Sequence, residues 1–103
     1  MNTIFKALSH PVRRQIVVML RGGPMSSGQI AEAFDMAWPS VTAHLKVLRR
    51  ADLVDAERDG TSIRYRLKIS AAEEAMAFLI EMFGSASGVA SREQTLREES
   101  EPA

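Results

Sequence analysis

Cysteine is absent from this 103-residue chain. Its absence excludes disulfides, thiolate metal sites, iron–sulfur ligation and cysteine-based redox sensing. No apolar run approaches the length that is needed to span a bilayer. The first six residues also lack the charged-then-apolar order of a secretory signal. These absences predict a cytoplasmic protein that does not insert into membranes.

An excess of charge of one sign is also missing, because thirteen Lys and Arg balance thirteen Asp and Glu. The balance hides an asymmetry along the chain. Residues 1–68 carry eleven basic and six acidic side chains, whereas residues 69–103 carry two and seven. The first part therefore suits contact with a polyanion. An uneven scatter without functional meaning explains the same counts about as well.

Catalytic and cofactor motifs are lacking too. The chain has no phosphate-binding glycine loop and no His-Glu metal pair. His10 and His44 are far apart in sequence, with no carboxylate or thiol at chelating spacing. We therefore expect a protein that is not an enzyme, with no catalytic residue, no cofactor and no metal site.

Helical signals fill the first part of the chain. A short helical segment comes first, and Pro11 then suits the first position of a second helix, with Ser9 or His10 as its cap. Ser26 and Gln29 are spaced as a capping box for a third helix over residues 26–34. The pattern predicts short helices before residue 36.

A fourth helix, over residues 38–50, has one apolar and one polar face. Val41, Leu45 and Leu48 recur at helical spacing and form a buried stripe. Two interpretations of Trp38 stay open, a contact with a base or sugar and packing at the turn. The side chains expected to point outward are Pro39, Thr42, Ala43, Lys46 and Arg50, with Ser40 and His44 at the flanks.

After Asp52 the pattern changes from helix to strand. Residues 61–67 alternate apolar side chains with arginines, as a half-exposed strand does, and Asp59-Gly60 before them predicts a hairpin turn. Three arginines are expected to cluster around the hairpin tip, where they would reach a DNA backbone or minor groove. They are Arg58, Arg64 and Arg66.

A last helix is predicted after Ser70, with an apolar surface broader than one core face needs. Residues 85–103 are rich in Ser and Glu and have little to bury, so we expect a flexible tail there. The predicted organisation is therefore one domain over residues 1–84 followed by that tail.

Short helices, a hairpin and a closing helix describe a winged helix-turn-helix. The expected fold is mainly α, with a two-stranded β-hairpin wing and N- and C-terminal helices. The helices over residues 26–34 and 38–50 have the size of a DNA-reading pair, whose second helix enters the major groove.

Three segments of the sequence resemble ArsR-family repressors. Residues 5–16, FKALSHPVRRQI, resemble the opening of that family, and residues 40–51, SVTAHLKVLRRA, resemble its recognition helix. Asp59-Gly60 followed by residues 65–67, YRL, resembles its wing. The resemblance covers residues 2–83 and is strongest to the cysteine-free autorepressor subgroup.

The resemblance implies a winged-helix homodimer whose first and last helices form the interface. It assigns interface roles to the apolar side chains of those helices, and DNA contacts to the start of the recognition helix and to the wing. The implied DNA contacts are Ser40, Thr42, Ala43, His44, Arg58 and Arg64. The predicted interface residues are Ile4, Phe5, Leu8, Met76, Leu79 and Phe83.

The chain departs from the family pattern at several positions. Metal-sensing members use cysteines on the helix that matches residues 26–34 and His on the last helix, and this chain has neither. Ala43 stands where a long polar residue is frequent, so it touches a thymine methyl but makes no bidentate base contact. Asp52 stands where glycine is common, and aspartate tolerates the left-handed turn.

The residues and the resemblance together predict a repressor that binds double-stranded DNA at a palindromic operator as a homodimer, with its own gene as a candidate target. The alternative is a winged-helix module that binds a protein partner and no longer binds DNA. The sequence leaves open whether the protein has an inducer and whether that inducer is a small molecule or a protein.

Overall fold

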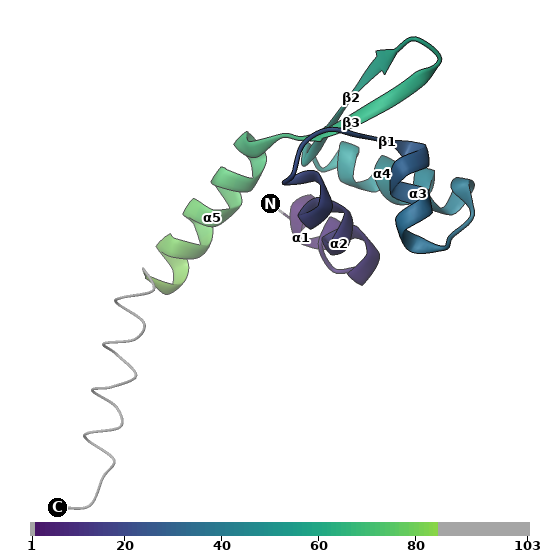
Figure 1. The fold of residues 1–103 in the computed structure, drawn as a ribbon. Coiled ribbons are helices and arrows are strands. Elements are labelled where there is room, and N and C mark those ends of the chain that lie inside the picture. The colour runs from purple at the N-terminus through teal and green to yellow at the C-terminus, as the bar shows by residue number, and fades with distance from the viewer. Residues whose placement is uncertain (1, 85–103) are drawn as a thin grey trace, which may run out of the picture. The chain divides into compact units, whose positions relative to one another are not determined.

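The computed structural model describes residues 2–84, so the predicted tail over residues 85–103 lies outside the described residues. The chain divides into two units, residues 1–73 and residues 74–103. Figure 1 shows eight elements: α1 (Asn2–Ala7), α2 (Pro11–Leu20), β1 (Met25–Ser26), α3 (Ser27–Phe34), α4 (Trp38–Arg50), β2 (Val54–Asp59), β3 (Ser62–Leu67) and α5 (Ile69–Phe83).

The junction of α1 and α2 is held by side chains that reach back to the end of α1. His10 caps α2, because its Nδ1 accepts a hydrogen bond from the Val12 N–H at 3.2 Å. Arg13 Nε donates to the Ala7 carbonyl at 2.7 Å. Arg14 Nη1 donates to the Leu8 carbonyl at 2.8 Å. Both arginines thus satisfy carbonyls at and after the end of α1, where cations are favourable.

The sheet has three antiparallel strands in the order β1-β3-β2, one more than expected. The additional strand, β1, has two residues, and Ser26 lies opposite Arg64 in it. Asp59 lies opposite Ser62, so the loop of the hairpin is Gly60-Thr61, one residue later than predicted. Gly60 has φ +64°, a conformation that glycine adopts without a steric cost.

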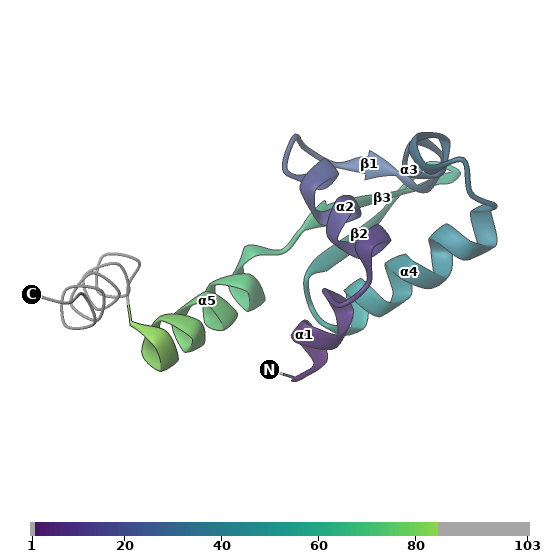
Figure 2. The ribbon, with the colours of Figure 1, turned by 90° about the horizontal axis from the view of Figure 1, so that it is seen from below.

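The core of the first unit lies around α4. This helix contacts α1, α2, α3 and β2, and Figure 2 shows it running along that group of elements. Asp52 follows α4 in the left-handed conformation, at φ +62°. Aspartate tolerates this conformation, as expected from the sequence for the position where glycine is common in the family. The largest fully buried side chains are Ile16, Ile30, Leu45, Leu48, Val41 and Val54.

Helix α5 begins one residue before the predicted cap, at Ile69, and from Glu74 onward it belongs to the second unit. Within residues 2–84, no helix combines the length and the apolarity needed to cross a membrane. The large apolar side chains of α5 in the second unit are Met76, Phe78, Leu79, Ile80, Met82 and Phe83.

Candidate nucleic-acid interface

Helices α3 and α4, with the turn between them, form a helix-turn-helix. The Ser26 hydroxyl accepts a hydrogen bond from the Gln29 N–H at 3.2 Å, and the Gln29 side chain accepts one from the Ser26 N–H at 2.9 Å. The predicted capping box is therefore confirmed. Asp35 ends α3 in the left-handed conformation, at φ +49°, and the chain then turns into α4.

Helix α4 presents one buried and one exposed face, as its spacing predicts. Val41, Leu45 and Leu48 are at most 1% exposed. His44 is half-buried, so it lies at the boundary between the two faces. The side chains predicted to point outward, and Ser40 at the other flank, are all exposed. They are Pro39, Ser40, Thr42, Ala43, Lys46 and Arg50.

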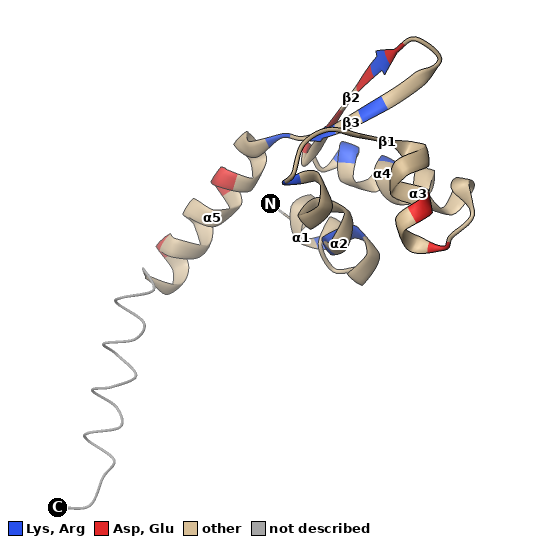
Figure 3. Cartoon of the chain, in the orientation of Figure 1, with Lys and Arg blue, Asp and Glu red and all other residues tan. Residues whose placement is uncertain are grey.

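The charge of α4 is entirely positive. Lys46, Arg49 and Arg50 are exposed, and the helix contains no acidic residue. Within residues 2–84, no salt bridge involves any of these three cations. Figure 3 shows α4 carrying Lys and Arg without Asp or Glu. Its exposed face is therefore suited to bind a polyanion.

The wing, defined here as β2, β3 and the turn between them, carries counter-charges of its own. Arg64 Nη1 lies 3.6 Å from Asp59 Oδ2, so the expected basic cluster at the tip is partly neutralised. Arg58 is exposed and has no salt bridge within the described part of the chain. Figure 3 shows both signs of charge along the hairpin.

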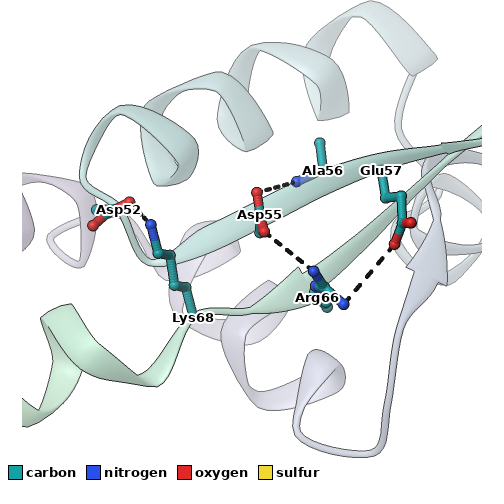
Figure 4. Close-up of polar contacts among 6 residues, drawn as sticks. All are labelled: Asp52, Asp55, Ala56, Glu57, Arg66 and Lys68. Atoms are coloured by element: carbon teal, nitrogen blue, oxygen red, sulfur yellow. Dashed lines mark hydrogen bonds and ion pairs between the residues drawn. The ribbon is translucent and has the colours of Figure 1, made fainter.

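At the base of the wing, cations are held by carboxylates (Figure 4). Arg66 lies between two of them, with Nη2 3.4 Å from Asp55 Oδ2 and Nη1 3.9 Å from Glu57 Oε2. Lys68 Nζ lies 2.7 Å from Asp52 Oδ1, and this hydrogen bond and charge raise the pKa of Lys68. These carboxylate partners of the wing's arginines were not predicted from the sequence.

His44 and His10 lie against each other, which their distance in sequence did not indicate. Their ring centroids are 4.5 Å apart, with the planes tilted by 51°. Partial burial, then the charges of His10 and Arg13, lower the pKa of His44. We expected the two histidines to lie on elements unable to share a site; they are adjacent. Among residues 2–84 no group of three or more His, Asp or Glu is placed to hold a metal.

The predicted interface residues differ in exposure. Ile4 is 6% exposed and belongs to the protomer's own core, which leaves little of its surface for a partner. Leu8 is half-buried. The other four are exposed: Phe5 at 36%, Met76 at 53%, Leu79 at 37% and Phe83 at 63%.

Comparison with known proteins decides the family. The helix-turn-helix domain family matches residues 8–57. The transcriptional repressor SdpR of Bacillus subtilis is 38% identical over 80 residues, which are 78% of this chain and 89% of that protein. A crystal structure of an ArsR-family transcriptional regulator has a TM-score of 0.71 and 27% identity, covering 98% of this chain and 92% of that one. The chain belongs to the ArsR family of winged helix-turn-helix repressors.

The solved structure of a second transcriptional repressor is similar as well. The transcriptional repressor BigR from Xylella fastidiosa superposes with a TM-score of 0.63 at 31% identity, covering 82% of this chain and 86% of that one. In DNA-binding helix-turn-helix proteins the second helix of the pair is the recognition helix, and α4 takes that position here. The family consists of DNA-binding transcriptional regulators, not of enzymes.

Proposed function

We propose that this ArsR-family repressor binds a palindromic operator as a homodimer, with α4 in the major groove. The exposed face of α4 carries the proposal, because it holds three cations, no acidic residue and the small side chains of Ser40, Thr42 and Ala43 over a fully buried stripe. A helix of this kind reads base edges with its exposed side chains and phosphates with its cations.

Two regions of the first unit are assigned to DNA. The recognition helix reads the major groove, and the wing contacts the backbone beside it. Lys46 and Arg50 neutralise phosphates, whereas Thr42 and Ala43 face base edges. The full set of proposed contacts is Pro39, Ser40, Thr42, Ala43, His44, Lys46, Arg50, Arg58 and Arg64.

Helices α1 and α5 are proposed to form the dimer interface. Seven large apolar side chains in a 15-residue helix, all at least 36% exposed in the single chain, exceed what isolated surface residues explain. A two-fold axis through this interface places two recognition helices about 34–36 Å apart, one turn of DNA. The proposed contacts are Phe5, Leu8, Met76, Leu79 and Phe83, whereas Ile4 packs in the protomer's own core.

The biological setting follows from the same proposal. The protein acts in the cytoplasm on DNA, residues 1–84 form the binding and dimerisation domain, and its own gene is a proposed target. Release from DNA depends on an inducer, a small molecule or a protein, or on dilution of the repressor.

The test is fluorescence anisotropy with labelled duplexes, both from the DNA upstream of the chain's own coding region and from a selected random pool. We expect an inverted repeat to be enriched, with log affinity falling linearly with log salt, by about 0.9 for each phosphate contact. Failure of every duplex to bind more tightly than random-sequence DNA, at any salt, overturns the proposal.

A matched pair of variants tests the dimer. Leu79→Glu places a charge in the proposed interface, and light scattering should then show a monomer that has also lost operator binding. Ala77→Glu adds the same charge to the same helix but, at about 100° per residue, on the opposite side, beside Glu81 and Glu74. It should leave both properties unchanged, and an equal effect of the two variants contradicts the proposed interface.

A further inference from the structure

Trp38 is the first residue of α4 and the chain's single tryptophan, and it is 57% exposed. Its indole is supported by α3. A Cβ built on Gly28 would lie only 3.0 Å from Trp38 Cζ2, so the ring rests against the α3 backbone at a point where no side chain intervenes. Support on one side and exposure on the other fix the ring as part of the surface that carries the recognition helix.

A hollow lies beside this indole on the exposed face of α4. Most of its lining is apolar: the indole, a proline ring and an alanine methyl group. One cation, Lys46, is also part of the lining. The lining residues are Ser27, Trp38, Pro39, Thr42, Ala43 and Lys46.

The chemistry of the lining selects one group of the major groove. Base edges there present hydrogen-bond donors and acceptors, and the thymine methyl is the single apolar group among them. The hollow contains no Asn, Gln or Arg, so Lys46 is its one side chain able to make a bidentate contact with a purine, and that contact is with guanine. An apolar lining with one cation instead matches a methyl group next to a phosphate or a guanine edge.

We infer that this hollow receives a thymine methyl group and that Trp38 is a specificity-determining residue for the operator. The inference rests on the proposed function, because it requires α4 in the major groove. It adds a contact beyond the small side chains of α4. The indole supplies one wall of the hollow, and Gly28 on α3 positions that wall.

The decisive probe is an operator duplex in which deoxyuridine replaces thymidine, first throughout one half-site and then one position at a time. Deoxyuridine keeps the base pairing and removes only the methyl group. At one position per half-site, we expect the affinity measured by anisotropy to fall about fourfold, the factor given by burial of one methyl-sized group. Intrinsic fluorescence of Trp38 should change on binding the thymidine duplex and change less with the deoxyuridine duplex.

Variants assign the effect to the indole. Trp38→Ala should bind both duplexes equally and keep the salt dependence of the wild type, because the cations are untouched. Gly28→Ala keeps the ring but places a methyl group 3.0 Å from Cζ2, so it should reduce the discrimination without adding to the loss in a double variant. Val18→Ala removes a half-exposed apolar side chain from α2 and should discriminate as the wild type does.

The outcomes separate the two levels of the proposal. Discrimination that is lost in Trp38→Ala and kept in Val18→Ala supports the inference. Specific, salt-dependent binding in which no thymidine position matters, or in which Trp38→Ala discriminates as the wild type does, overturns the inference and leaves the proposed function standing. Absence of specific binding to any duplex overturns both.

Discussion

The recognition helix α4 and the wing carry the same number of basic side chains but in opposite electrostatic settings. The helix has Lys46, Arg49 and Arg50 with no carboxylate. The wing has three arginines among three carboxylates, and two of these arginines are in salt bridges. Counting cations therefore overstates what the wing offers to DNA, because a phosphate that contacts Arg64 or Arg66 must replace a carboxylate that is already in place.

The two regions also differ in how they are held. Helix α4 has a fully buried stripe beneath its exposed face, whereas the wing buries only two side chains, Val54 in β2 and Tyr65 in β3. Exposed salt bridges such as those of the wing contribute about 0–1 kcal/mol each. Helix α4 is thus held by core packing, and its cations are in no salt bridge within residues 2–84. The wing has less core packing, and two of its three arginines are in salt bridges. The four predictions below test this contrast.

The largest expected difference is in stability. Leu45→Ala empties a site that is 1% exposed beneath α4 and should lower the free energy of unfolding by about 2–5 kcal/mol. Ile63→Ala, in the wing, removes a side chain that is 40% exposed and should change it by about 0.5 kcal/mol or less. Urea unfolding followed by circular dichroism measures both. Similar losses would show that the wing is held by packing as firmly as α4.

The next difference is in the salt dependence of DNA binding. Lys46→Ala should reduce the slope of log affinity against log salt by about 1, because one phosphate contact is lost. Arg64→Ala should reduce it by less, since Asp59 already lies 3.6 Å from this guanidinium. Anisotropy titrations at several salt concentrations give both slopes. A larger effect of Arg64→Ala would reverse the ranking of the two regions.

Removing a carboxylate from the tip should strengthen binding. Asp59→Asn releases Arg64 for a phosphate, and we expect a gain of about two- to fivefold, as follows from an exposed ion pair of up to about 1 kcal/mol. Asp55→Asn is the matched control: it removes the same charge at the wing's base, where Glu57 still faces Arg66. Equal gains from the two variants would reduce the effect to net charge alone.

The smallest expected effect is on pH dependence. The pKa of His44 is lowered in the folded chain, so the unfolded chain binds more protons, and the free energy of unfolding should fall as pH drops below about 6.5. The pKa of Lys68, at the wing's base, is raised in the folded chain. Its contribution to the free energy of unfolding should therefore be lost as pH rises above about 10.4 and through the folded-state pKa. Urea unfolding across pH, with His44→Gln and Lys68→Met, separates the two windows. An unchanged low-pH loss in His44→Gln would exclude His44 as its source.

Local patterns in the sequence predicted most of the fold. Ser26 with Gln29 and the stripe from Val41 to Leu48 lie within single helices, where capping and periodicity act over a few residues. The strand β1 was not predictable in this way, since two residues have no periodicity and their pairing with β3 depends on the tertiary fold.

The candidate site was predictable in the same uneven way. The outward face of α4 follows from helical geometry. The pairing of charges in the wing was only partly within reach: the predicted turn at Asp59-Gly60 sets Arg64 opposite Asp55, whereas the observed turn at Gly60-Thr61 sets Arg66 there. The contact of His10 with His44 and the seat of Trp38 on Gly28 join different helices. No local pattern encodes such packing.

Ser26 has a mechanical consequence. Its backbone pairs with Arg64 in the sheet, and its hydroxyl caps the helix that precedes the recognition helix. Ser26 therefore connects the hairpin mechanically to the helix-turn-helix. A movement that tilts α3 therefore moves the hairpin as well. A signal that releases the protein from DNA has to displace the helix-turn-helix and the wing together, not one after the other.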